Sequence, residues 1–520
     1  MRILLVSLAC FAVAGAVSAG TLSVKILDEN GSPAPARVYL TDSSGQLQVP
    51  AGMIVYKRTR NVSEEHFVPP SGAFKIDLRS GVYHLVVERG KEYLPAGENI
   101  RVSGGAAEKT VRLRRWVRMT DRGWYSADMH IHRPLLDLGA IMEAEDLNFA
   151  VNITRWRVGD REIAEDPELD AFLAKSDANG AMKSANERWF TVLNEELEPP
   201  ESALLVSRMG KVRSTLEYPM AAYGRALRQR GALVDSEKAT SLELPAIAAL
   251  GGCETVGLAN NHLWRSGSFP GAWGAWPDRM MRAYPADCSG FALAGFEMYY
   301  ALLNAGLPLK LSAGSANGVH PVPPGWSRIY AHLDGEFTVE RWFEAVRAGR
   351  TFVTTGPMLL LTVNGLGPGQ EPRGAKFPMK AKVNVTVLSP DPVREVELVV
   401  NGDVRKLPLR GSGMTWSGAS DLELTTTTWI AARWMSGGDK VCGVAHTAPV
   451  LFRNGSQPVF VRRTEAEYLV KAVERLIDDV KAGRKGPGDA IPMIVTPTPV
   501  VREQTLGLLE QARDFYRGKL

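Results

Sequence analysis

Apolar and polar positions alternate with a period of two through residues 20–115. The clearest runs lie at 22–26, 36–40, 74–78 and 83–87, with turn-forming residues between them. This pattern is typical of short strands that each bury one face. We therefore expect residues 20–115 to form a small β-sandwich.

The pattern changes over residues 116–357, where helical and strand-like segments alternate. The expected strands lie at 148–154, 188–197, 256–260, 307–313 and 328–333. The expected helices lie at 138–147, 221–230, 292–305 and 338–348. Alternating β and α segments favour one α/β barrel or a doubly wound sheet.

Period-two patterning returns over residues 358–460. Strands are expected at 383–387, 396–400 and 429–434, and Asn401-Gly402 is a hairpin-type turn signal. We expect a second β-sandwich module here. Residues 461–520 instead repeat their apolar positions every three or four residues, which predicts a helical tail.

The first 19 residues have the features of a secretory signal peptide. Arg2 is followed by an apolar stretch at 3–17 and by small residues at 17–19. The stretch is shorter than the roughly 20 residues that a membrane-spanning helix needs. We expect an exported protein, periplasmic or extracellular, with no membrane insertion after cleavage.

Composition narrows the classes of partner. Lys+Arg 61 against Asp+Glu 57 leaves a net charge of only +4, and no basic run reaches five residues. This weighs against a nucleic-acid partner. After signal cleavage only Cys253, Cys288 and Cys442 remain, so at most one disulfide forms. A Cys-based zinc site is not expected, because no CxxC motif occurs.

The candidate chemistry begins at Asp128, His130 and His132. If they belong to one strand, all three side chains share a face, because side chains alternate along a strand. Two imidazoles beside a carboxylate are typical ligands of zinc or a similar metal. Three further predicted strands end in polar residues that include Glu195 and Glu196, His262 and Arg265, and His320.

Two segments carry a family resemblance. The sequence Gly-Trp-Tyr-Ser-Ala-Asp-Met-His-Ile-His-Arg at 123–133 resembles the first motif of the polymerase-and-histidinol-phosphatase (PHP) superfamily, nearest to CehA/McbA-type metallohydrolases. The run at 348–357 resembles the segment that closes that domain. The resemblance implies a distorted (β/α)7 barrel with one to three metal ions and hydrolase chemistry. Residues 20–115 resemble carboxypeptidase-regulatory-like modules.

The chain departs from the family pattern at two motifs. Ile-Thr-Arg at 153–155 lacks the expected Asp and His, and the late motif at 314–320 has lost its Asp. Arg155 would repel a cation, so we expect one divalent ion, zinc, manganese or iron. The candidate ligands are His130, His132, Glu196, His262 and His320, with Glu195 as the alternative to Glu196.

Two functional hypotheses follow. In the first, the exported chain is a metal-dependent hydrolase that activates water against a (phospho)ester, carbamate or amide bond of a small anionic or polar substrate. Glu196 or Asp128 would accept the proton, while Arg133, Arg155 and Arg265 would favour negative charge in the substrate or transition state. In the second, the chain is a non-catalytic secreted binding protein on a degenerate PHP barrel. Oligomeric state stays open.

Overall fold

The computed structural model describes most of the 520-residue chain. The described residues are 19–56, 64–158, 161–184, 187–198, 202–208, 219–265, 267–268, 284–285, 287–320, 322–372, 374–436, 443–457, 462–483, 496 and 498–520. The predicted secretory signal, apart from Ala19, lies outside them. The chain is multidomain and mostly β-sheet.

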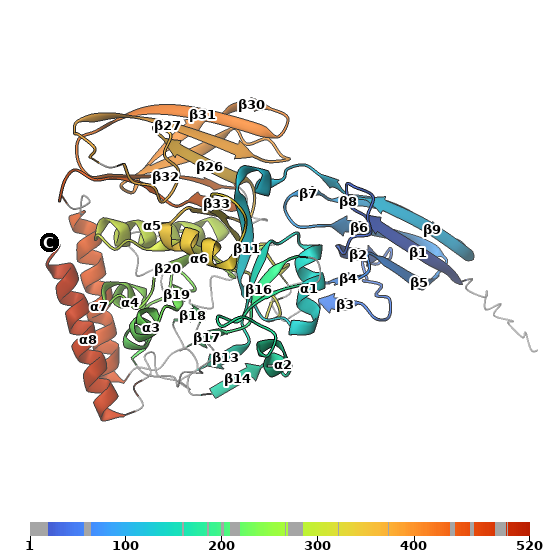
Figure 1. Cartoon of the computed structure of the whole chain (residues 1–520), viewed down its shortest axis with the longest axis horizontal. Coiled ribbons are helices and arrows are strands. Elements are labelled where there is room, and N and C mark those ends of the chain that lie inside the picture. The colour runs from blue at the N-terminus through green and yellow to red at the C-terminus, as the bar shows by residue number, and fades with distance from the viewer. Residues whose placement is uncertain are drawn as a thin grey trace, which may run out of the picture.

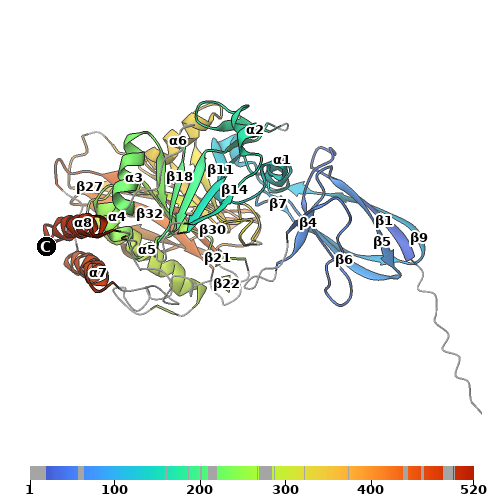
Figure 2. The same cartoon turned by 90° about the horizontal axis from the view of Figure 1, so that it is seen from below.

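Two views show how the parts are arranged along the long axis. The N-terminal strands lie at one end and the two C-terminal helices at the other, with the central part between them (Figures 1 and 2). The C-terminal β-strands cover one side of the central part (Figure 1).

The N-terminal module consists of two sheets around one apolar core. The order is β5 (Ala73–Arg79), β1 (Ala19–Leu27) and β9 (Gly105–Arg112) in the first sheet. In the second sheet it is β3 (Ile54–Tyr56), β4 (His66–Val68), β2 (Arg37–Thr41), β6 (Gly81–Glu88) and β8 (Ala96–Val102). Alternate side chains such as Leu22, Val38 and Leu85 fill the space between the sheets. The arrangement is compatible with the predicted β-sandwich.

A short connection leads into the central part. It contains β10 (Arg114–Arg115) and the 3-10 turn at Met119–Arg122. β10 pairs with β7 (Tyr93–Leu94), which lies between β6 and β8 in the chain.

The central part begins in an eleven-stranded sheet. Its order is β15 (Ala181–Lys183), β16 (Trp189–Thr191), β12 (Phe149–Asn152), β11 (Trp124–Ile131), β24 (Arg328–His332) and β25 (Thr351–Thr354), followed by β33 (Val444–Thr447), β32 (Thr428–Met435), β28 (Glu395–Val400) and β29 (Asp403–Pro408). The short β34 (Val450–Phe452) also pairs with β32. Because β25 pairs with β33, the sheet runs without a break across the predicted boundary at residue 357.

A seven-stranded sheet faces the first half of this sheet. Its order is β14 (Arg161–Glu165), β13 (Arg155–Val158), β17 (Asn194–Glu198), β18 (Leu204–Ser207), β19 (Leu233–Ser236), β20 (Thr255–Ala259) and β23 (Lys310–Ala313). Residues next to two of its strands, Ile153 before β13 and Asn317 after β23, bond to the end of β11. The Ile153 N–H donates to the Ile131 carbonyl at 2.6 Å, and the His132 N–H donates to the Asn317 carbonyl at 2.7 Å.

Helices cover the strands of the central part. They are α1 (Leu135–Ala144), α2 (Leu169–Leu173), α3 (Met220–Gln229), α4 (Leu244–Ala249), α5 (Cys288–Asn304) and α6 (Val339–Ala348). A two-strand pair, β21 (Leu263–Trp264) with β22 (Gly267–Ser268), follows β20. The four helices expected from the pattern are confirmed, and no bound differs by more than four residues.

One predicted strand is wrong in its extent. The segment 188–197 forms two strands, β16 and β17, which belong to different sheets. The Asn194 side chain explains the break, because its Nδ2 donates to the Thr191 carbonyl and to the Asn152 carbonyl, both at 2.8 Å. An Asn side chain that bonds to nearby backbone favours a turn over a continuous strand.

The C-terminal strands form a second sheet pair. The sheet β26 (Met358–Val363), β27 (Met379–Leu388), β31 (Thr415–Leu424) and β30 (Arg410–Ser412) shares an apolar core with β28 and β32. The hairpin turn between β28 and β29 is confirmed, since Asn401 and Gly402 both have positive φ, at 49° and 87°.

Two helices end the chain, as predicted. They are α7 (Arg463–Ala482) and α8 (Pro499–Arg517), and the Tyr516 hydroxyl donates to the Pro245 carbonyl of α4 at 2.7 Å. Among the described helices, none is long and apolar enough to cross a bilayer. Cys253 is a buried free thiol, whereas Cys288 is disulfide-bonded.

Candidate metal centre

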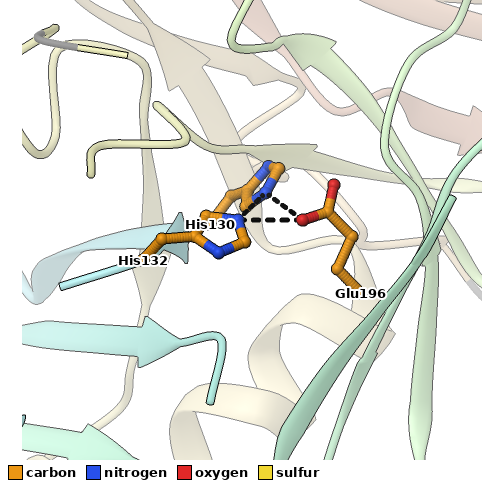
Figure 3. Close-up of side chains that lie close together, drawn as sticks. All are labelled: His130, His132 and Glu196. Carbon is orange, nitrogen blue, oxygen red and sulfur yellow. Dashed lines mark hydrogen bonds and ion pairs between the residues drawn. The ribbon is translucent and has the colours of Figure 1, made fainter. Parts of the chain in front are cut away.

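Three side chains that are distant in sequence converge at the end of β11. His130 Nε2 lies 2.9 Å from His132 Nε2 and 3.3 Å from Glu196 Oε2. His132 Nε2 lies 2.8 Å from the same Glu196 oxygen. The three side chains point toward one another from two facing strands (Figure 3). Of the five predicted ligands, the structure brings these three together.

The spacing of these atoms fits one small divalent ion. A tetrahedral zinc ion with bonds of 2.0–2.1 Å places its ligand atoms roughly 3.3–3.4 Å apart. The separation of His130 Nε2 from Glu196 Oε2 equals this value, and the other two separations are about 0.5 Å shorter. His130 and Glu196 are 1% and 3% exposed, so an ion held here would be shielded from bulk water. Two imidazoles and one carboxylate leave coordination positions for a water or a substrate.

The local structure of β11 holds the two histidines in place. The pairing register between β11 and β12 shifts between Asp128 and Ile131, which marks a bulge at His130. Gly314, just after β23, lies against this point: a Cβ there would be 2.3 Å from the His130 Cβ. Only glycine leaves room for the close approach of these two strands.

Asp128 braces this strand end and does not join the three ligands. Its Oδ1 accepts from the backbone N–H of His130 at 2.9 Å and of Ser315 at 3.1 Å. Its Oδ2 accepts from the Ser315 hydroxyl at 2.5 Å and from the Gly325 N–H at 2.7 Å. Burial raises the pKa of Asp128 although these donors oppose the shift. These four hydrogen bonds tie Asp128 to the backbone of His130, Ser315 and Gly325 and to the Ser315 hydroxyl.

Glu195 and Glu196 are neighbours on β17, so their side chains point to opposite faces of the sheet. Glu196 faces the histidines, whereas Glu195 accepts from the Tyr223 hydroxyl at 3.4 Å and lies 3.3 Å from Arg157 Nε. Arg155 is on this second face, with its Nη1 3.8 Å from Glu195 Oε1. The structure therefore does not place Arg155 beside the candidate metal.

Trp156 occupies the face on which Arg155 was expected. In the register between β13 and β17, Trp156 pairs with Glu196. Its ring lies 5.2 Å from the ring of His132, and its indole N–H donates to Glu198 Oε2 at 3.2 Å. A one-residue shift along a strand moves a side chain to the opposite face, which explains the exchange.

The pKa values of His130 and Glu196 depend on the charges of the residues beside them. Burial alone would lower the pKa of His130, but the carboxylates of Glu196 and Glu237 outweigh burial and raise it to about 9. Burial alone would raise the pKa of Glu196, but the charges of His130 and His132 hold it well below its ordinary value.

Sequence reasoning missed a buried pair beside His130. Glu237 Oε1 lies 3.3 Å from His130 Nδ1, and the Lys238 ammonium is bonded to the other oxygen of Glu237. A carboxylate beside the second nitrogen of a metal-ligating histidine is a common outer-shell arrangement. The signal was the short buried run that forms β19 after a predicted helix, with Glu237 directly following it.

Glu198 is a further missed carboxylate. Burial, followed by the charge of Glu196, raises the pKa of Glu198 to about 7. It follows Glu196 by two residues on the same strand, so period-two alternation puts both on one face.

The remaining predicted ligands stay outside the group of three. His262 stacks on Phe291, with ring centroids 5.7 Å apart. His320 lies beside Trp264, with centroids 5.7 Å apart. Burial, followed by the positive charge of Lys238, lowers the pKa of His320 to about 4.

Two predicted arginines face the N-terminal module. Arg133 contacts Asp137 at 3.3 Å and lies over the ring of Tyr56, 4.6 Å from its centroid. Arg265 contacts Glu88 through Nη1 at 2.6 Å and Nη2 at 2.8 Å. The structure shows both in contacts that join the central part to the N-terminal strands.

Comparisons with protein-family models, with curated proteins and with solved structures found no match to this chain.

Proposed function

We propose that the chain is a metal-dependent hydrolase that holds one divalent ion on His130, His132 and Glu196. The observation that carries the proposal is the meeting of their three ligand atoms at 2.8–3.3 Å in a buried position. A bound zinc, manganese or iron ion would supply an activated water and would polarise the scissile group.

The surrounding side chains have distinct roles in this proposal. Glu237 orients His130 through Nδ1 and is itself held by Lys238. Asp128 holds the backbone of His130 by accepting a hydrogen bond from its N–H. Trp156 packs beside His132 and limits access of water from that side. Substrates with a phosphoester, carbamate or amide bond suit such a site.

The same proposal includes a PHP-type barrel and export. In support of a distorted (β/α)7 barrel, β13, β17, β18, β19, β20 and β23 are successive neighbours in one sheet. Ile153, before β13, and Asn317, after β23, both bond to the end of β11. The antiparallel β18 is the main departure from a regular βα repeat. Export rests on the sequence of residues 1–19.

Metal analysis of the purified protein tests the proposal. We expect about one equivalent of zinc, manganese or iron after incubation with each ion, and its loss in the double variant His130→Ala/His132→Ala. The control is His84→Ala, because His84 is an exposed residue on β6 of the N-terminal module. Hydrolysis of phosphoester, carbamate and amide model substrates should depend on the same ion. A wild-type protein that takes up none of the three metals refutes the proposal.

One observation favours a second candidate, a non-catalytic binding protein. Glu196 with the two histidines, and Glu237 with Lys238, already form ion pairs with one another. A buried network of this kind can be charge-balanced without an ion. Failure of metal uptake, with the fold intact by circular dichroism, would support this candidate.

A further inference from the structure

A cavity of about 490 Å³ lies where three parts of the chain meet. Lys91 contributes from the N-terminal module, Trp326 and Arg328 from the central part, and Trp434 from the C-terminal strands. The volume is in the range of binding sites for small organic molecules. None of the three candidate metal ligands lines the cavity, so it is a separate feature.

Positive charge exceeds negative charge in the wall. Two glutamates are already paired with arginines. Arg37 Nη1 contacts Glu145 at 2.5 Å, and its Nη2 contacts Glu88 at 2.6 Å. Arg265 forms two bonds to the same Glu88. The wall holds one further carboxylate, Asp391, so its four cations exceed its three carboxylates by one. Among the described residues, Lys91 and Arg328 have no carboxylate in direct contact.

The two Lys91 contacts seen in the described part of the chain are with neutral groups. Its Nζ donates to the Thr355 carbonyl at 2.7 Å and lies 4.1 Å from the centroid of the Trp326 ring. Within the described part of the chain, no carboxylate lies within 4.0 Å of this Nζ. Burial, followed by the charge of Arg328, holds the pKa of Lys91 well below its ordinary value. An anion beside Lys91 would offset both effects.

Arg328 adds positive charge behind the cavity wall. This fully buried side chain donates from Nε to the Gly325 carbonyl at 2.7 Å and from Nη2 to the Glu145 carbonyl at 3.1 Å. Its Nη1 has no hydrogen-bond partner among the described residues. The nearby Tyr330 hydroxyl donates to Glu92. Among the described residues, the hydrogen bonds that Arg328 donates from Nε and Nη2 go to neutral carbonyls, so its positive charge adds to that of Lys91.

Much of the rest of the wall is apolar and aromatic, and Ser389, Asp391 and Ser436 are among its polar members. Trp116 and Trp326 donate their indole N–H groups to the carbonyls of Lys91 at 2.9 Å and Leu263 at 3.1 Å. Trp434 lines the opposite side, together with several prolines. Tryptophan rings whose polar edge is already bonded present flat apolar surfaces to a ligand.

We propose that this cavity binds a small organic carboxylate with a flat apolar body. The carboxylate pairs with the Lys91 ammonium, and the body packs against the tryptophans. A ligand of this class supplies the missing negative charge and covers the apolar wall at the same time. The site is independent of the proposed metal chemistry.

Isothermal titration calorimetry with naphthalene-2-carboxylate as the probe tests the proposal. Naphthalene-2-carboxamide has the same body without the charge, and acetate has the charge without the body. We expect the carboxylate to bind and the other two to bind at least tenfold more weakly, because each lacks one of the two recognised features. Lys91→Gln should weaken binding at least tenfold, as expected for loss of a charge-assisted contact. Lys75→Gln is the matched control, because Lys75 is exposed on β5 of the same module.

Further arms of the experiment separate this site from the metal centre. Binding should be unchanged in the double variant His130→Ala/His132→Ala and after treatment with a chelator, so loss of binding there would assign the probe to the metal centre and overturn the proposal. Trp434→Leu should weaken binding while the unfolding midpoint stays near that of wild type. No binding of the naphthoate, or equal binding to wild type and Lys91→Gln, would also overturn it.

Discussion

Replacing Gly314 by alanine tests the contact on which the candidate metal centre depends. Gly314 does not have a positive φ, so alanine is allowed by the backbone and the strain is purely steric. The added Cβ would lie 2.3 Å from the His130 Cβ and 3.0 Å from the His130 backbone nitrogen. Ordinary contact begins near 3.4 Å. The two strands must therefore separate by about 1.1 Å.

Two effects of different size follow from this displacement. Overpacking of a tight interior typically costs about 1–3 kcal/mol of unfolding free energy. If an ion is bound, moving His130 by about 1 Å also disturbs its coordination, and we expect a loss of roughly 10–100-fold in zinc affinity, as for other changes to the support of a metal ligand. The loss of affinity should exceed that of any substitution remote from β11.

The measurements are the midpoint of urea unfolding and zinc affinity by competition with a chromophoric chelator. The control is Gly507→Ala in α8, where an added Cβ meets no atom within 4 Å. It should stabilise that helix by about 0.5–1 kcal/mol and leave zinc affinity unchanged. A Gly314→Ala protein with wild-type unfolding and wild-type zinc affinity would refute the packing of β23 against β11 described above.

Three further predictions concern carboxylates. Burial alone would raise the pKa of Glu88, but Arg37 and Arg265 outweigh burial and lower the pKa from 4.5 to about 2. The pairing of Glu88 with these arginines therefore stabilises the fold fully above pH 4.5. This stabilisation is lost as the pH falls towards 2. Glu88→Gln should cost about 1–3 kcal/mol of unfolding free energy at pH 7. The difference between the urea midpoints of variant and wild type should shrink below pH 4.5 and vanish only as the pH approaches 2. Asp128→Asn should lower the free energy of unfolding by about 1–3 kcal/mol, because the new amide NH2 would face groups that are themselves hydrogen-bond donors. An unchanged thermal unfolding midpoint would contradict the role of Asp128 in holding this strand end. Glu237→Gln should weaken zinc binding about tenfold or more in chelator competition, and equal affinity would remove Glu237 from the support of His130.

The sequence was sufficient to predict those helices and turns whose signals lie within about a dozen consecutive residues. The helix 338–348 is an example: Thr338 caps α6 through the Arg341 N–H, and Gly349 ends it in the left-handed conformation with φ of 74°. Both signals are visible in the sequence. The hairpin at Asn401-Gly402 was predictable for the same reason.

Pairing between distant strands could not be predicted in this way. The strand β33 joins β25 across about 90 residues of chain, so nothing in the local sequence of Thr351–Thr354 indicates its partner. The sheet consequently continues from the central part into the C-terminal strands. The short β18 and β19 were also missed, because four fully buried residues carry no alternation that distinguishes strand from helix.

In the candidate site, too, local sequence signals were predictive and the pairing of distant strands was not. His130 and His132 were predictable because alternation within one strand puts them on one face, and Glu196 because its strand ends nearby. Arg155 was misplaced and Trp156 overlooked because the pairing register, and not the sequence, decides which face of β13 meets the histidines.

The two carboxylates expected from the sequence to accept a proton are both otherwise occupied. Glu196 contributes the oxygen that meets both histidines, and Asp128 accepts four hydrogen bonds from the loop and strand around it. A hydrolase at this site therefore needs another proton acceptor. Glu237 lies behind His130 and is bonded to Lys238, which suits support better than proton transfer. Glu198 lies on the same strand face as Glu196 and is held by the single hydrogen bond from Trp156. The geometry thus favours Glu198 as the acceptor in the proposed reaction, a residue whose role became visible only when the strands were paired.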